Sequence, residues 1–192
     1  DNAVYPVRVD PTFGYTTAGT GVFSTTDTVA RIIGSAVSNT PAEAGTVTDV
    51  QVYAAARVDT SASAVDIYAA IYKVSDLSLL SPQSSILTIS GSDQTGSWRQ
   101  LAWSGPSVTT VAYYPSIRIK SQGGARPGFQ IWRDSGVSGD SVFQTTETLW
   151  PDPLVPTNST YKYSIYATYT ASGGAITNPA GTLKVLNGVL NI

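Results

Sequence analysis

Cysteine, histidine and methionine are all absent from this chain of 192 residues. Without cysteine there is no disulfide framework, no thiolate nucleophile and no cysteine metal site. Without histidine the chain lacks the commonest general base and metal ligand. Charged side chains are scarce as well, at 12% of the residues, where about a quarter is usual. These absences argue against a conventional enzyme.

Charge and hydropathy limit the partners and the location that we expect for this protein. The net charge of −2, with no cluster of Lys and Arg, argues against nucleic acid as a partner. No apolar stretch approaches the roughly 20 residues of a membrane-spanning helix, so we expect no membrane insertion. Since the chain begins at Asp1 rather than Met, we expect a removed leader or propeptide, or a fragment of a longer chain. We therefore expect a protein that works outside a cytoplasm.

Apolar and polar residues alternate with a period of two along most of the chain, which is typical of β-strands. Residues 47–58 carry Val and Ala on one face, residues 65–74 are apolar on both faces as in a central strand, and residues 161–169 alternate except at Tyr166. Further strands are predicted at residues 4–9, 29–33, 86–90, 98–103, 111–120 and 128–133. Many short strands separated by turn residues predict an all-β protein, with a single jelly-roll-like antiparallel β-sandwich over residues 1–170.

Residues 171–192 are predicted to form a linker and a C-terminal β-hairpin extension. Asn187-Gly188 is the strongest short signal for a two-residue hairpin turn. An isolated hairpin is marginal in water, so this one is expected to dock on its own sandwich or, preferably, on a second copy or partner chain. The apolar side chains that would dock are Leu183, Val185, Val189 and Ile192.

Several segments have a recognisable sequence pattern. Residues 47–55 and 65–73 each form an alternating strand, Gly96-Ser97-Trp98 opens a later one, and residues 183–189 read Leu-Lys-Val-Leu-Asn-Gly-Val. This pattern resembles that of jelly-roll modules of bacterial surface proteins and of phage structural or tail proteins. The resemblance implies a fold and a habitat, and it carries no catalytic residue.

Aromatic residues are the best candidates for ligand binding, with 4 Trp and 11 Tyr in the chain. Sugar rings stack on flat aromatic faces while polar neighbours fix the hydroxyls. Trp150 lies in a Pro-rich stretch beside Asp152, and Trp132 precedes Arg133. We take these four residues as a candidate glycan site; the alternative is that each Trp belongs to the core.

The acids give a weaker signal. Most lie beside turns, where Asp side chains bond to nearby backbone, so no catalytic pair of carboxylates is expected. Asp134 and Asp140 flank a loop that could present oxygen ligands to calcium; an ordinary hairpin loop is the alternative. No other cofactor is expected.

Two functions remain. The first is a non-catalytic structural or adhesive subunit of an extracellular or virion-surface assembly, such as a capsid decoration, a fibre or a surface layer. Its partners would be copies of itself or other subunits. The alternative is a carbohydrate-binding module that recognises surface glycans through exposed aromatic residues.

Overall fold

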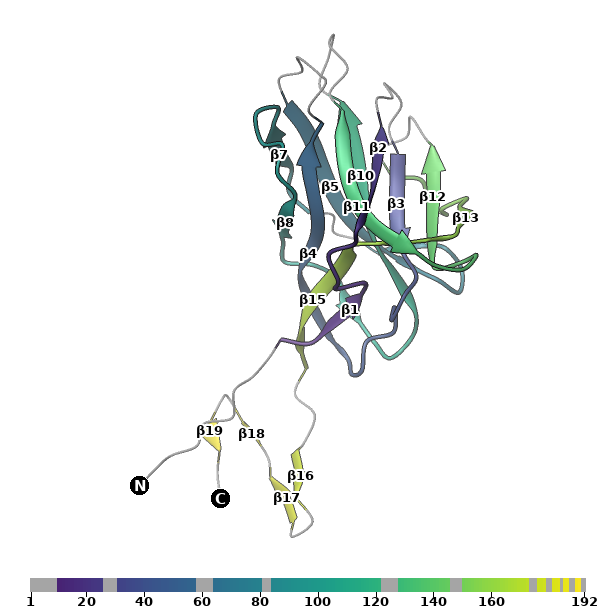
Figure 1. The fold of residues 1–192 in the computed structure, drawn as a ribbon. Coiled ribbons are helices and arrows are strands. Elements are labelled where there is room, and N and C mark those ends of the chain that lie inside the picture. Colours follow the sequence, from purple (N-terminus) through teal and green to yellow (C-terminus); the bar gives the residue numbers. More distant parts are fainter. Residues whose placement is uncertain are drawn as a thin grey trace.

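The computed structural model describes residues 10–25, 31–57, 64–80, 84–121, 128–145, 150–172, 176–178, 181–183, 185–186 and 189–190, with backbone only beyond residue 175. Two antiparallel sheets pack face to face (Figure 1). Sheet A has eight strands: β1 (Thr12–Gly14), β2 (Gly21–Thr25), β4 (Gly45–Ala56), β8 (Ser97–Ala102), β9 (Ser107–Val108), β11 (Phe129–Ser135), β14 (Tyr161–Tyr163) and β15 (Ile165–Ala171). Sheet B has seven: β3 (Arg31–Ser35), β5 (Ala64–Lys73), β6 (Leu79–Leu80), β7 (Leu87–Ser90), β10 (Tyr113–Ser121), β12 (Ser141–Thr145) and β13 (Thr157–Ser159).

The chain passes repeatedly from one sheet to the other. It crosses from β3 to β4, from β4 to β5, from β10 to β11 and from β11 to β12. The predicted all-β sandwich is therefore confirmed. The described residues contain no helix, and hence none long and apolar enough to cross a membrane.

Alternation along the long strands builds the core. Val50, Val52 and Ala54 of β4 point inward and meet Ile67 and Ile71 of β5 across the sandwich, and all five are fully buried. Because β5 pairs with β10 on one edge and with β6 and β7 on the other, it is the central strand that its two apolar faces predict.

Sheet B carries a second, smaller core on its outer face. The outward side chains of β5 include Ala70 and Tyr72, and both are fully buried. They are covered by the segment after β12, where Trp150 and Leu154 pack against them. The Tyr72 hydroxyl donates a 2.9 Å hydrogen bond to the carbonyl oxygen of Pro151, which ties the segment down.

The predicted strands are found within two residues of their expected ends wherever they are described, and the strand predicted at 4–9 lies outside the described residues. Residues 161–171 form two strands, because the pairing passes from β11 to β4 at Ser164. The short strands β1, β2, β6, β9, β12 and β13 were not predicted.

Beyond the sandwich, the described strands form two local pairs. β16 (Ile176–Asn178) pairs with β17 (Gly181–Leu183), and β18 (Val185–Leu186) pairs with β19 (Val189–Leu190). The second pair is the predicted hairpin around Asn187-Gly188. The side chains of Leu183, Val185 and Val189, and all of Ile192, lie outside the described part, so their docking stays a prediction.

Candidate functional site

The outer face of sheet A is built around strand β4. Val50, Val52 and Ala54 point into the core, so Gln51 and Tyr53 point outward. The antiparallel register places Trp98 of β8 opposite Tyr53 and Gln100 opposite Gln51. On the other edge of β4, Tyr166 of β15 lies opposite Gln51. Residues opposite each other share a face, so these side chains gather on one surface.

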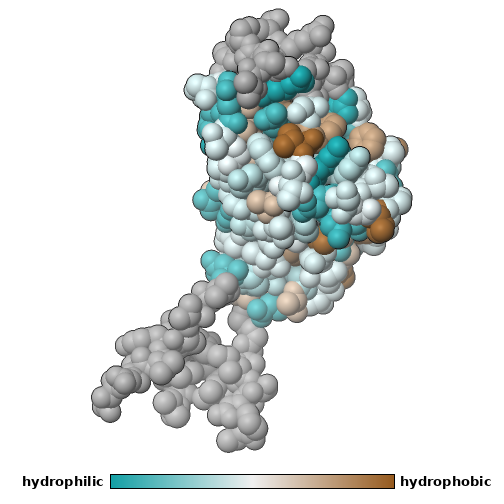
Figure 2. Space-filling model, in the orientation of Figure 1, coloured by the Kyte–Doolittle hydropathy of each residue, from teal (hydrophilic) through white to brown (hydrophobic). Residues whose placement is uncertain are grey.

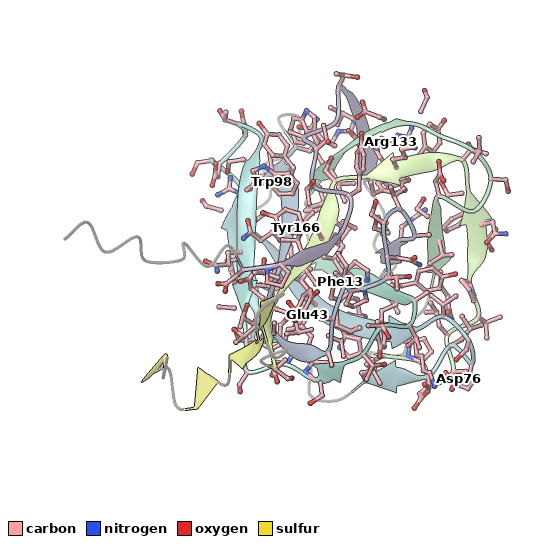
Figure 3. The ribbon with its side chains drawn as sticks, turned by 90° about the horizontal axis from the view of Figure 1, so that it is seen from below. Phe13, Glu43, Asp76, Trp98, Arg133 and Tyr166 are labelled. Atoms are coloured by element: carbon pink, nitrogen blue, oxygen red, sulfur yellow. The ribbon has the colours of Figure 1, made fainter. Side chains whose placement is uncertain are left out.

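Four half-buried rings form what we call the aromatic row: Trp132, Tyr53, Trp98 and Tyr166. The Tyr53 ring centroid lies 5.3 Å from that of Trp132 and 5.4 Å from that of Trp98. Trp98 in turn lies 4.9 Å from Tyr166, and Figure 3 shows this pair side by side at one flank of the molecule. All three contacts are close to perpendicular, at 71° to 85°. Edge-to-face contacts hold the rings in fixed orientations.

A glycine allows two rings of the aromatic row to lie close to the backbone. A Cβ atom at Gly96 would lie 2.7 Å from the Tyr53 ring and 2.8 Å from the Trp132 ring. Only a residue without a side chain allows the backbone before β8 to approach both rings this closely. Gly96 therefore helps to set the position of the two rings.

A polar group borders the row, and we call it the amide cluster: Asp49, Gln51 and Gln100. Asp49 is only 6% exposed. Its Oδ1 accepts a 3.3 Å hydrogen bond from Gln51 Nε2, and its Oδ2 accepts one of 3.2 Å from Gln100 Nε2. Each amide is thereby oriented with its nitrogen toward the acid. Within the described part of the chain, neither amide oxygen has a partner.

The positive charge next to Trp98 in the sequence is directed away from this surface. Arg99 lies between Trp98 and Gln100 in β8 and so points to the opposite side, where it forms a 2.6 Å ion pair with Asp93. Lys162 lies opposite Asp134, two residues beyond Trp132 along β11, and so shares the outer face with Trp132. Burial raises the pKa of the Tyr166 hydroxyl, and the negative charge of Asp49 raises it further. Tyr166 is therefore a neutral hydrogen-bonding group beside an acid.

The face of the protein seen in Figure 2 is weakly polar rather than apolar. Figure 2 shows a face dominated by residues of intermediate hydropathy, with the strongly hydrophobic ones in separate spots. The exposed apolar residues, among them Ile86, Val137 and Val155, are likewise scattered. Scattered apolar residues are normal on a protein surface, so the grouped aromatic rings are the more informative feature.

Of the four predicted glycan-site residues, the structure places only Trp132 in the aromatic row. Arg133 follows it in β11 and so points to the opposite face. Its guanidinium carbon lies 3.3 Å from the ring centroid of Tyr161 and 5.4 Å from that of Phe23. The expectation that Trp132 and Arg133 serve one site is therefore wrong.

For Trp150 the sequence left an exposed and a core position open, and the structure shows the core position. Its side chain is only 7% exposed and packs against Tyr72, with ring centroids 6.2 Å apart. Nearby, Asp152 accepts a 3.1 Å hydrogen bond from the backbone N–H of Leu79. Both residues hold the segment after β12 against sheet B, and Trp150 has no free ring face on which a sugar could stack.

Asp134 and Asp140 each hold part of the local backbone. Asp134 accepts hydrogen bonds from the Tyr15 hydroxyl at 2.7 Å and from the N–H and hydroxyl of Thr20, both at 2.9 Å. The bond from the Thr20 N–H, followed by that from Tyr15, lowers the pKa of Asp134. Asp140 accepts a 2.8 Å bond from the N–H of Val137. The described residues contain no group of three or more acids that could hold a metal; calcium binding stays a prediction.

Comparison with models of known protein families and with curated proteins finds no match for this chain.

Proposed function

We propose that this protein is a non-catalytic β-sandwich module that binds carbohydrate on the outer face of sheet A. The observation that carries the proposal is the aromatic row beside the amide cluster. The rings are only half-buried although they are held in fixed positions. A binding surface that is ordered before the ligand arrives loses less entropy on binding.

The chemistry of the surface favours a sugar. Sugar rings present C–H faces that pack on aromatic rings, and hydroxyls that hydrogen-bond to amides and carboxylates. The amide oxygens of Gln51 and Gln100, which have no partner among the described residues, are acceptors for such hydroxyls. Single-stranded nucleic acid also stacks on aromatic rings, but it needs a positively charged groove, and here Arg99 is paired with Asp93 on the other side of the strand.

A glycan array followed by calorimetry with the best glycan tests the proposal. Trp98→Ala is expected to weaken binding by about tenfold or more, as truncation of a central aromatic contact does. Tyr161→Ala is the matched control, because it removes an exposed ring from outside the row and should leave the affinity unchanged. Absence of binding to every glycan at millimolar concentration would overturn the proposal.

The proposed setting is extracellular or on a virion surface, within an assembly of this chain with itself or with other subunits. Its support comes from the sequence: the low charge and the apolar C-terminal hairpin. Deleting residues 175–192 should leave the sandwich folded and reduce the mass measured by light scattering. A full chain that stays monomeric at high concentration would contradict the assembly, but not glycan binding.

A further inference from the structure

A pocket of about 180 Å³ opens between the two sheets at one end of the sandwich. Sheet A contributes Phe23, Arg133, Tyr161 and Tyr163, while sheet B contributes Arg31 and Phe143 among others. None of these residues belongs to the aromatic row. The pocket is therefore separate from the proposed glycan surface, and in Figure 3 Arg133 lies apart from Trp98 and Tyr166.

Arg133 is held in place by aromatic rings. Its guanidinium carbon is 3.3 Å from the ring centroid of Tyr161, 5.4 Å from that of Phe23 and 5.8 Å from that of Tyr163. Its Nη1 donates a 3.3 Å hydrogen bond to the Tyr163 hydroxyl. The planar group is thus held against the rings, and among the described residues Nη1 is the one nitrogen of its guanidinium with a hydrogen-bond partner.

The structure shows no direct contact between Arg133 and an acid among the described residues. Its guanidinium forms no ion pair with any of them, and the neighbouring carboxylate of Asp134 is occupied by Tyr15 and Thr20. Arg31 belongs to the opposite sheet, and its guanidinium carbon lies 6.0 Å from the ring centroid of Phe23. Two guanidinium groups line this pocket, and none of its described lining residues carries a carboxylate.

We propose that this pocket binds a small organic carboxylate that carries a ring. The carboxylate would meet the Arg133 guanidinium, which matches its planar geometry with two parallel N–H donors. The ring would lie against Phe23 and Phe143, the apolar walls of the pocket. Those walls disfavour a bare inorganic anion, because it would lose hydration without gaining apolar contacts. This inference does not rest on the proposed glycan binding.

Calorimetry with benzoate and glucuronate, at constant ionic strength, tests the inference. Benzoate has an apolar ring and glucuronate a hydroxylated one, so the order of their affinities shows which kind of ring the pocket prefers. Benzyl alcohol and glucose are the uncharged counterparts, and acetate is the carboxylate without a ring. We expect at least one ring carboxylate to bind with 1:1 stoichiometry and about tenfold or more tighter than its uncharged counterpart.

Variants assign that binding to the pocket. Arg133→Gln should weaken it by about tenfold or more, and Arg133→Lys should restore only part of the loss, because lysine lacks the planar fork. Lys73→Gln is the matched control: it removes one positive charge from a surface pair with Asp76 and should change nothing. Each variant is first checked by thermal unfolding.

A second variant keeps the test independent of the charge. Phe143→Trp should fill the pocket and abolish binding while both arginines remain. Binding that survives both Arg133→Gln and Phe143→Trp would overturn the inference, as would equal binding of the uncharged counterparts or no binding of either ring carboxylate. Glycan binding on the aromatic row should be unaffected by these variants, so the two proposals fail separately.

Discussion

The outer faces of the two sheets carry the same kinds of aromatic residues but bury them to different extents. On sheet B, Tyr72 lies under Trp150 and is completely buried, and the segment that contains Pro151 and Leu154 closes over it. On sheet A, Tyr53 and Trp98 make ring contacts just as close, yet both remain half-buried.

The difference separates structural aromatic residues from candidate binding residues. Burying a large aromatic side chain stabilises a fold by about 1.5–3 kcal/mol, and the chain obtains that gain on sheet B with a short segment of its own. On sheet A none of the described segments covers the row. The rings that are ordered but left uncovered are therefore the ones available to a ligand.

Removing one tryptophan from each face should give the clearest test of the difference between the two faces. Trp150→Ala is expected to lower the free energy of unfolding by about 3–5 kcal/mol, because it empties a buried site. Trp98→Ala should cost about 1 kcal/mol, mainly its ring contacts, while it weakens glycan binding. Urea denaturation measures both. Equal losses of stability would show that the row is as structural as the cover over Tyr72.

The acids of the two faces sharpen the comparison. Asp49 orients both amides on sheet A, whereas Asp152 accepts one hydrogen bond from Leu79 on sheet B. Asp49→Ala should cost about 2 kcal/mol of stability and Asp152→Ala about 1 kcal/mol, in proportion to the hydrogen bonds lost. Only Asp49→Ala should also weaken glycan binding. Calorimetry in which Asp152→Ala weakened the glycan equally would remove the distinction between the faces.

Gly96 tests whether the arrangement of the row matters apart from its composition. In Gly96→Ala the new methyl group would displace the Tyr53 and Trp132 rings. The strain should cost about 1 kcal/mol, with a larger relative loss of glycan affinity than of stability. Tryptophan fluorescence and calorimetry measure the two effects. Unchanged fluorescence together with unchanged affinity would show that the close approach of Gly96 is incidental.

Sequence patterning predicted the long strands because burial on one face repeats every second residue. Strands β6 and β9 have two residues each, so they display no period and depend on their neighbours for pairing. The Pro-rich segment around Trp150 has the composition of an exposed loop. It is buried because Tyr72 and Ala70 on a distant strand offer it an apolar surface, which local composition does not encode.

The candidate site was harder to predict because each of four strands contributes one ring. Which rings meet depends on register: Tyr53 faces Trp98 only because β4 and β8 pair as they do. One signal was present, since Tyr166 interrupts the alternation of its strand and proves to be an outward ring of the row. Trp132 and Arg133 were assigned to one site because they are adjacent in sequence, although adjacent strand residues point to opposite faces.

Ionisation of the tyrosines is expected to give the smallest difference between the two faces, since its effect on stability vanishes at neutral pH. Burial raises the pKa of Tyr72 far above its ordinary value of 10.0, and it raises that of Tyr166 as well. A raised pKa favours the neutral hydroxyl in the folded state, so each group contributes stability below pH 10 that is lost as the pH rises beyond the unfolded value.

Denaturation of wild type, Tyr72→Phe and Tyr166→Phe between pH 8 and pH 11 separates the two contributions. Each variant is compared with its own stability at pH 8, which removes the constant cost of the lost hydroxyl. The alkaline loss of stability should become shallower in both variants, and more so in Tyr72→Phe, because Tyr72 lies beneath the Trp150 segment and Tyr166 is only half-buried. Absorbance at 295 nm should show Tyr166 ionising before unfolding and Tyr72 only with it. If Tyr72 ionises first, the cover on sheet B is open in solution and the contrast between the two faces is lost.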